Sequence, residues 1–305
     1  MSFNVLLLGG GKKVSLARHL KNCGNKNNKK IRVFSYDLDV RLPVSKEAKI
    51  IQGKKYSDKR IIHHLKKVIN KFKISLVIAA TDPSTILISK LKNLGIASCK
   101  LCSDLKTNKL LLNKSLTNKF LENKKILTTS SPKGFPLIAK LNKGSASSSN
   151  FLINSLRSKN EFEKKNKNYI FEKYISGLEY SVDLYISNTD ILKGIVCRKR
   201  VEITGGESTI ILSEKNKKLE KLAFQIAKYF KIKGPANIQF IYKNEKYYFM
   251  EINPRIAGGI MNTIVSGLDI PDLMIKEILN KKSSKFIFKK MKTIKFFEDY
   301  HEIYN

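Results

Sequence analysis

The chain has 305 residues, which is long enough for more than one compact lobe and too long for one ordinary small domain. Its 59 basic and 25 acidic residues leave a formal net charge of +34, but lysine is spread over every segment, so a dedicated nucleic-acid surface is not indicated. No apolar run approaches the roughly eighteen residues that span a bilayer, and four scattered cysteines suggest no disulfide framework. We therefore expect a cytoplasmic protein without a membrane segment.

The N-terminal third of the chain alternates short apolar runs with segments of helical spacing. The runs Val5–Leu8, Arg32–Tyr36 and Leu76–Ala80 lack a helical period, whereas Asp58–Phe72 has one. Strands and helices that alternate in this way form parallel sheets, because each crossover helix returns the chain to the same edge. The pattern predicts an α/β, Rossmann-like first domain over residues 1–103.

Three glycines, Gly9–Gly11, directly follow the first predicted strand. Such a turn can bind a dinucleotide, with Asp37 as the ribose acceptor, and would then indicate a nicotinamide-dependent enzyme. The six-residue glycine fingerprint is interrupted, however, because Lys12–Val14 follow, so a tight turn that opens a helix is an equal interpretation. Free backbone N–H groups at that helix start could receive an anion such as a substrate carboxylate.

A run of small residues, Lys143–Ser149, follows a predicted strand that carries Lys140. Small residues let backbone amides approach a polyphosphate, and a lysine at the strand supplies a point charge. A flexible surface linker is the alternative interpretation of the same run. The elements predicted around it are a helix over 104–121, a strand over 137–141, a helix over 155–164 and a strand over 169–175.

Near the C-terminus, two strands predicted over 234–242 and 247–254 carry polar residues at every second position. Asn237 and Gln239 alternate with apolar residues in the first strand, and Glu251, Asn253 and Arg255 do so in and after the second. A carboxylate beside amide oxygens is a set of hard ligands that suits Mg²⁺ holding phosphate oxygens. The hairpin therefore predicts a metal site, with an ordinary amphipathic hairpin edge as the alternative.

The two polar sets share a face only if Gln239 pairs opposite Glu251. This register predicts a three-residue loop over 244–246, in which Asn244 or a neighbour takes a left-handed conformation. A two-residue loop would instead place Met250 opposite Gln239 and split the site.

Two arginines, Arg198 and Arg200, lie on one face of a further predicted strand that ends in Gly205-Gly206. They could bind an anionic substrate, or they could belong to a charged edge strand.

An ordered set of motifs runs through most of the chain. In sequence order these are Asn108-Lys109, the Lys140 strand with its Gly144-Ser145-Ala146-Ser147 loop, Glu172-Lys173-Tyr174-Ile175, Glu179, Asn237-x-Gln239 and Glu251-x-Asn253-Pro254-Arg255. The set resembles the ATP-grasp superfamily, and in particular short stand-alone proteins similar to one half of the carbamoyl phosphate synthase large subunit. The resemblance implies a pre-ATP-grasp domain over 1–103, a small lobe with a phosphate lid over 104–171, a large metal-binding lobe over 172–281 and a C-terminal extension over 282–305.

The resemblance also implies a role for each motif. The implied ATP-binding residues are Lys109 and Lys140 at the phosphates, Gly144, Ser145 and Ser147 in the lid, Glu172, Lys173, Tyr174 and Ile175 at the adenine, Glu179 at the ribose, and Asn237. The implied metal ligands are Gln239, Glu251 and Asn253, holding one or two Mg²⁺ ions, with Mn²⁺ as a substitute. Lys140 and Arg255 are the implied catalytic residues, and Arg198, Arg200 and Arg255 the implied substrate contacts.

The resemblance implies an ATP-dependent carboxylate-amine ligase that works through an acyl phosphate and releases ADP and phosphate. Its partners would be a small-molecule carboxylate and an amine, with no specific nucleic acid and no membrane; a homodimer is compatible with the sequence. The full synthase has two such halves and this chain has one, so a carboxylate larger than bicarbonate is the better expectation. The alternative is a non-catalytic nucleotide- or polyanion-binding module on the same fold.

Overall fold

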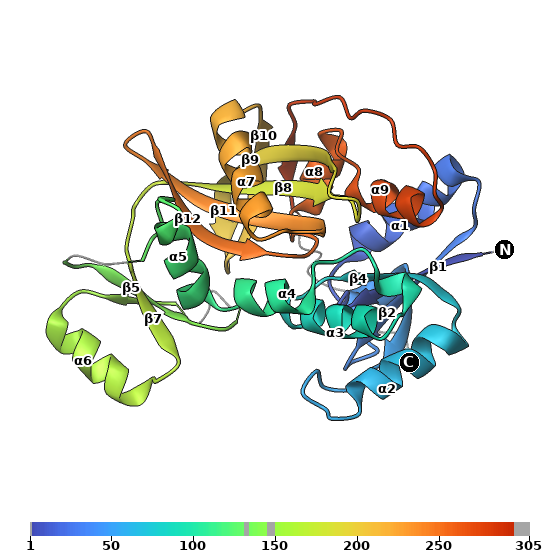
Figure 1. Ribbon diagram of the computed structural model, residues 1–305, viewed down its shortest axis with the longest axis horizontal. Coiled ribbons are helices and arrows are strands. Elements are labelled where there is room, and N and C mark those ends of the chain that lie inside the picture. Colours follow the sequence, from blue (N-terminus) through green and yellow to red (C-terminus); the bar gives the residue numbers. More distant parts are fainter. Residues whose placement is uncertain (1, 131–133, 145–149, 296–305) are drawn as a thin grey trace.

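The computed structural model describes residues 2–130, 134–144 and 150–295 of the chain. The molecule is elongated, and three sheets follow one another along its longest axis (Figure 1). The N-terminal sheet lies at one end, a small sheet at the other, and a large sheet between and above them. This arrangement is the mixed α/β architecture that the sequence predicts.

The N-terminal domain contains a four-stranded parallel sheet in the order β3-β2-β1-β4. Its elements are β1 (Phe3–Leu8), α1 (Val14–Asn27), β2 (Ile31–Asp37), η1 (Pro43–Lys46), β3 (Lys49–Gln52), α2 (Ile61–Lys71), β4 (Ile74–Ala79), α3 (Asp82–Asn93) and η2 (Ala97–Cys99). Every residue of β1 is buried, as expected for a central strand covered by helices on both faces. Gly9 follows β1 with a φ of +78°, so the glycine run forms a tight turn that leads to α1.

A small lobe follows, with a three-stranded antiparallel sheet in the order β6-β5-β7. Its elements are α4 (Leu105–Leu111), α5 (Lys114–Asn123), β5 (Leu137–Leu141), β6 (Phe151–Ile153), α6 (Leu156–Lys165) and β7 (Tyr169–Lys173). The single helix predicted over 104–121 is wrong, because Asn113 begins a new helix by accepting a hydrogen bond from the backbone N–H of Leu116.

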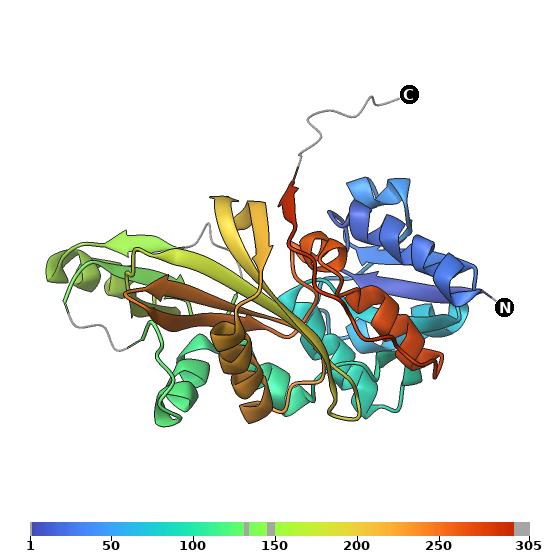
Figure 2. The same ribbon diagram turned by 90° about the horizontal axis from the view of Figure 1, so that it is seen from above.

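The large lobe contains a six-stranded sheet in the order β12-β11-β8-β9-β10-β13. Its elements are β8 (Leu178–Ile186), β9 (Leu192–Thr204), β10 (Glu207–Glu214), α7 (Lys217–Tyr229), β11 (Gly234–Lys243), β12 (Lys246–Asn253), α8 (Ile260–Val265), α9 (Ile270–Ile278) and β13 (Lys292–Ile294). Helix α7 packs Ala223, Ile226 and Ala227 against apolar residues of β8 and β11, and so covers one face of the sheet (Figure 2). The opposite face near β8, β11 and β12 carries the polar residues described below.

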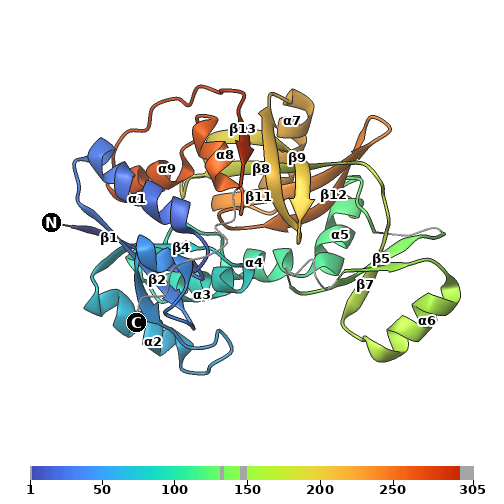
Figure 3. The same ribbon diagram turned by 180° about the vertical axis from the view of Figure 1, so that it is seen from behind.

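The segment after residue 281 is a part of the fold rather than a peripheral extension, as far as residue 295. Phe286 and Phe288 pack against the core cluster that contains α8 and α9. Strand β13 then pairs antiparallel with β10 and completes the sheet (Figure 3). This segment therefore helps to hold α8 and α9 in place.

The N-terminal domain and the large lobe share one apolar core. Leu16 and Leu20 of α1 belong to the same buried cluster as Ile260 of α8 and Met274 of α9. Such a shared core favours a fixed relation between the two parts over a free hinge.

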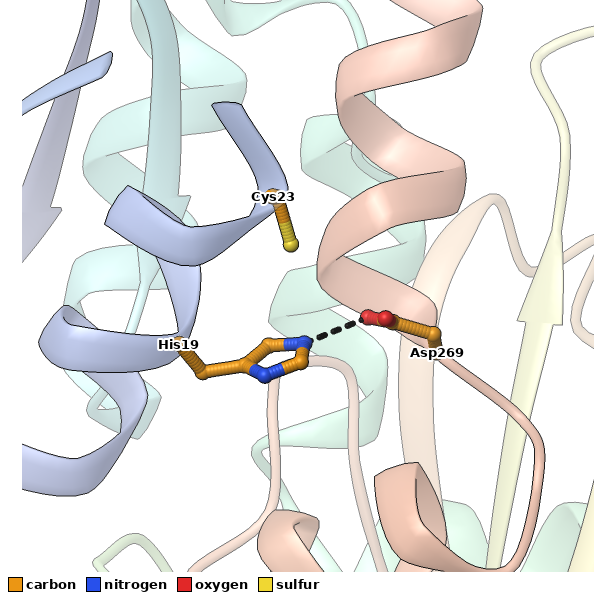
Figure 4. Close-up of side chains that lie close together, drawn as sticks. All are labelled: His19, Cys23 and Asp269. Carbon is orange, nitrogen blue, oxygen red and sulfur yellow. Dashed lines mark hydrogen bonds and ion pairs between the residues drawn. The ribbon is translucent and has the colours of Figure 1, made fainter. Parts of the chain in front are cut away.

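At the edge of this interface, the Nε2 atom of His19 lies 2.8 Å from a carboxylate oxygen of Asp269, next to the buried thiol of Cys23 (Figure 4). Asp269 also pairs with Lys26 and accepts the backbone N–H of Asp272 at the start of α9. Burial raises the pKa of Cys23 to about 12, so the thiol stays protonated at neutral pH. We therefore interpret this group as a contact that joins α1 to α9.

The hairpin between β11 and β12 has the predicted register but not the predicted loop. Gln239 pairs with Glu251, as expected, yet Lys243 pairs with Lys246, so Asn244 and Glu245 form a two-residue loop. The three-residue loop was therefore a wrong prediction.

The two observations are reconciled by a β-bulge directly after the Gln239 pair. Phe240 pairs with Phe249, which leaves Met250 as one extra residue on β12. The bulge shifts the register by one residue and returns the polar residues of β12 to the face that carries Gln239. Bulges of this kind leave little trace in a single sequence.

Replacing Glu245 with glycine should stabilise the hairpin. Asn244 and Glu245 both have positive φ values, 47° and 57°, as in a type I′ turn, where Asn-Gly is the favoured pair. Relief of the left-handed strain at Glu245 should contribute about 0.5–1 kcal/mol, partly offset by the greater chain entropy of glycine. Hydrogen exchange of the β11 and β12 amides should slow by about two- to fivefold, whereas Lys243→Gly, at a strand position, should accelerate it.

Candidate functional site

A row of polar residues crosses four strands of the large sheet. Arg198 of β9 pairs with Ser181 of β8, Ser181 pairs with Gln239 of β11, and Gln239 pairs with Glu251 of β12. Directly paired residues point to the same face of a sheet, so the predicted common face for Gln239 and Glu251 is confirmed.

A second row on this face contains Asp183, Asn237 and Asn253, again directly paired across β8, β11 and β12. Asp183 is 1% exposed and accepts hydrogen bonds from Arg198, Asn237 and Thr263. A buried carboxylate needs such complete pairing to remain charged. Sequence reasoning missed Asp183, because a single acidic residue in a strand carries no recognisable signal.

Arg198 is buried rather than directed at a substrate. Its side chain is 2% exposed, and its Nε and Nη2 atoms each lie 2.9 Å from Oδ2 of Asp183. The same arginine crowds Gly259, where an added Cβ would lie 2.4 Å from Nη1. The substrate contact implied for Arg198 is therefore corrected: its side chain is buried beneath the polar face, where Nε and Nη2 hold Asp183.

Arg200 connects the face to the hairpin loop between β9 and β10. Its Nη1 atom lies 2.5 Å from a carboxylate oxygen of Glu179 and 3.3 Å from Oε1 of Gln239. Its remaining donors reach Ser208 and the carbonyl of Gly206, at 2.7 Å each. The implied ribose ligand Glu179 thus lies beside the implied metal ligand Gln239, with Arg200 between them.

The three implied metal ligands are brought together, and their chemistry fits Mg²⁺. Asn253 donates a hydrogen bond of 3.1 Å to Glu251, and Gln239 lies opposite Glu251 in the register. Within residues 2–130, 134–144 and 150–295, no basic side chain pairs with Glu251 at 4.0 Å or less. A half-buried carboxylate that forms no ion pair among the described residues, beside two amide oxygens, is a suitable donor set for a hard divalent cation.

Arg255 is held by the N-terminal domain. Its Nε and Nη2 atoms lie 2.6 Å and 3.3 Å from the two carboxylate oxygens of Asp82, the first residue of α3. This bidentate pair fixes the plane of the guanidinium group, and Nη2 also approaches Oδ1 of Asn253 at 3.4 Å. Asp82, which sequence reasoning also missed, therefore links the first domain to the metal ligands.

Lys140 forms a buried ion pair in the small lobe. Its ammonium group lies 2.8 Å from Glu172, whose side chain is fully buried and also accepts from Asn118 and Thr129, at 2.9 Å and 2.7 Å. The carboxylate of Glu172 is therefore occupied inside the lobe, and the contact with adenine that the resemblance implies for this residue would be made by its backbone.

The segment after Glu172 has few backbone donors left for an adenine. The N–H groups of Lys173 and Tyr174 donate to the carbonyls of Thr129 and Pro136, at 2.7 Å and 3.2 Å. Ile175 follows directly. Adenine recognition at this segment would therefore use its carbonyl groups and the N–H of Ile175.

The implied phosphate lid is described only as far as Gly144, and Ser145 and Ser147 lie outside the described residues. The ammonium group of Lys114, at the start of α5, lies 2.5 Å from the carbonyl oxygen of Gly144. Lys109 is exposed on α4, while its neighbour Asn108 is buried and bonds to Ser89. The structure thus brings Lys114 to the lid, a residue that the motifs in the sequence do not include.

The fold and the site agree with the resemblance to ATP-grasp proteins, and comparisons with known proteins point the same way. Residues 165–297 match the family described as "ATP-grasp in the biosynthetic pathway with Ter operon". The fold resembles a biotin carboxylase from Campylobacter jejuni, with a TM-score of 0.72 and 15% identity over 93% of this chain and 73% of that chain. It also resembles an N5-carboxyaminoimidazole synthetase from Staphylococcus aureus solved with ADP, with a TM-score of 0.72 and 16% identity over 94% of this chain and 81% of that chain.

A curated relative has the higher sequence identity over a shorter stretch. The chain is 35% identical over 137 residues to the carbamoyl phosphate synthase large chain of Clostridium perfringens, strain SM101. This match covers 40% of the present chain and only 12% of the relative.

Among the helices of the described residues, none has both the length and the apolar character needed to span a bilayer.

Proposed function

We propose that the protein is an ATP-dependent carboxylate-amine ligase that forms an acyl phosphate and releases ADP and phosphate. The observation that carries the proposal is the pairing of Gln239 with Glu251, which sets a carboxylate beside two amide oxygens on one sheet face. The carbamoyl phosphate synthase and N5-carboxyaminoimidazole synthetase relatives support it. We also propose that the protein is cytoplasmic and that its two substrates are small molecules.

The proposed reaction has two steps. A carboxylate oxygen of the substrate forms a bond to the γ-phosphorus of ATP, and the bond from that phosphorus to the β,γ-bridging oxygen breaks, which releases ADP. An amine nitrogen then forms a bond to the acyl carbon, the bond from carbon to the phosphate oxygen breaks, and the amine proton is lost to solvent or phosphate. Both steps require charge neutralisation and exclusion of water more than a nucleophilic side chain.

The described residues supply these requirements in our proposal. Glu251, Asn253 and Gln239 would hold Mg²⁺, which neutralises phosphate charge when bound. Arg255, fixed by Asp82, would stabilise the transferred phosphoryl group, and Lys140 would contact ATP phosphates from the small lobe. We further propose that residues 1–103, 104–171 and 172–281 act as the pre-ATP-grasp domain, small lobe and metal-binding lobe.

Hydroxylamine trapping tests this function, because hydroxylamine takes the place of the natural amine and captures the acyl phosphate as a hydroxamate. The protein is incubated with Mg-ATP, hydroxylamine and one carboxylate at a time, and ADP and hydroxamate are measured together. We expect both products with at least one acid, in equal amounts, and neither without Mg²⁺. Nucleotide binding without any hydroxamate, or salt-sensitive binding of nucleic acid without turnover, would instead support a non-catalytic module.

A further inference from the structure

A cavity of about 550 Å³ lies at the carboxyl edge of the N-terminal sheet. Residues that follow three of the strands line it, among them Gly9 after β1, Asp37 at the end of β2 and Thr81 after β4. In the strand order β3-β2-β1-β4, the direction of winding reverses between β1 and β4, and parallel sheets bind ligands at such a switch point. Of the residues assigned above to ATP or metal, none of those that the structure describes lines this cavity.

Lys13 connects this cavity to the segment that follows Arg255 in the large lobe. It lines the cavity just before α1, and its ammonium nitrogen lies 3.8 Å from the position that a Cβ atom would take at Gly258, three residues after Arg255. Thr81 makes a second connection, because the next residue is Asp82, the partner of Arg255. The cavity therefore ends next to the arginine that we assign to the phosphoryl group.

The charge of Lys13 has no partner in the part of the chain that the structure describes. Lys13 is half-buried, and among described residues no acidic group pairs with it at 4.0 Å or less. Burial lowers its pKa, Glu207 opposes this effect, and the nearby charge of Arg255 lowers the pKa further. Lys13 therefore offers a cation to an anionic ligand in the cavity, with the guanidinium group of Arg255, which Asp82 holds, close by.

Asp37, which also lines the cavity, offers a carboxylate to a cationic group of a ligand. Asp37 accepts a hydrogen bond of 2.5 Å from Ser35, and within the described ranges no basic side chain pairs with it. Burial raises the pKa of Asp37, so a cation placed beside it would gain a partner and stabilise its charged form. The cavity thus presents an anion site at Lys13 and a cation site at Asp37.

We propose that this cavity binds the carboxylate substrate, a small amino acid whose carboxylate lies between Lys13 and Arg255 and whose amino group faces Asp37. The inference rests on the ligase function proposed above and adds the class of substrate. The volume of about 550 Å³ lies in the range of pockets for small molecules. A carboxylate held at Lys13 would be next to Arg255, where the acyl phosphate forms.

The test uses Mg-ATP and hydroxylamine with each of the twenty common L-amino acids, and with propionate and succinate as acids without an amino group. We expect ADP release with at least one amino acid and with neither simple acid. For that amino acid, Lys13→Met should raise KM at least about tenfold while KM for ATP stays within twofold, and Lys13→Arg should recover part of the loss. Asp37→Asn should also raise KM for the amino acid.

The matched control is Lys66→Met, which removes an exposed lysine of α2 outside the cavity and should leave both KM values unchanged. Any one of three results would overturn the inference. These are an unchanged KM for the amino acid in Lys13→Met, ADP release with the simple acids alone, and no ADP release with any acid of the panel. Calorimetric binding of Mg-ATP separates the two proposals: the wild type and Lys13→Met should bind it equally. Failure of the wild type to bind Mg-ATP would contradict the ligase function itself.

Discussion

Glu251→Gln should reduce ligase turnover by at least about a thousandfold and leave the fold intact. The change removes the one carboxylate of the implied metal set and keeps a side chain of the same size, so the hydrogen bond with Asn253 can re-form through the amide. Without that charge the site loses affinity for Mg²⁺, and the developing phosphate charge loses its main stabilisation. Hydroxamate formation with saturating Mg-ATP measures the loss.

A charge-matched control separates the site from a general electrostatic effect. Glu161→Gln, on α6, removes an exposed carboxylate that pairs with surface Arg157 across one helical turn, and should leave turnover unchanged. Calorimetry should show that Glu251→Gln weakens nucleotide binding in Mg²⁺ but not in EDTA. Wild-type turnover by Glu251→Gln would refute the metal assignment, whereas parallel losses in both variants would indicate long-range charge.

The polar face was largely predictable from the sequence, because alternation along a strand reports which side chains share a face. Gln239 and Glu251 were placed correctly in this way, although the supporting loop length was not. The bulge at Met250 is a backbone event without a residue signature, so periodicity could locate the site but not explain its register.

The residues that support the face were not predictable by the same reasoning. Asp183 is a single acid on β8 that meets Arg198 when β8 pairs with β9, and Asp82 is a single acid of another domain that meets Arg255 only when that domain packs against the large lobe. The sequence therefore indicated a substrate contact for Arg198, whereas its side chain is the buried partner of Asp183. Motif reasoning names the polar residues of a site, but their partners depend on tertiary contacts that a single sequence does not show.

Lys140→Met should lower both stability and activity, because the structure shows Lys140 as the counter-charge of a buried carboxylate. The ammonium group lies 2.8 Å from Glu172, which is 0% exposed, and its removal leaves only the neutral donors Asn118 and Thr129. Breaking a buried pair from one side costs about 3–5 kcal/mol. Hydrogen exchange of the β5 and β7 amides should therefore accelerate by more than about a hundredfold.

The double variant Lys140→Met, Glu172→Gln distinguishes this structural role from the proposed contact with ATP. Removing both charges should restore most of the exchange protection, since no uncompensated carboxylate remains, and the coupling energy of the cycle should reach about 2 kcal/mol. Turnover should stay low in the double variant, because the phosphate-facing cation is still missing. If turnover returned together with protection, Lys140 would act only through Glu172. Other cations would then have to neutralise the phosphates, and Lys114, whose ammonium group contacts the carbonyl of Gly144 in the lid, would be the first to test.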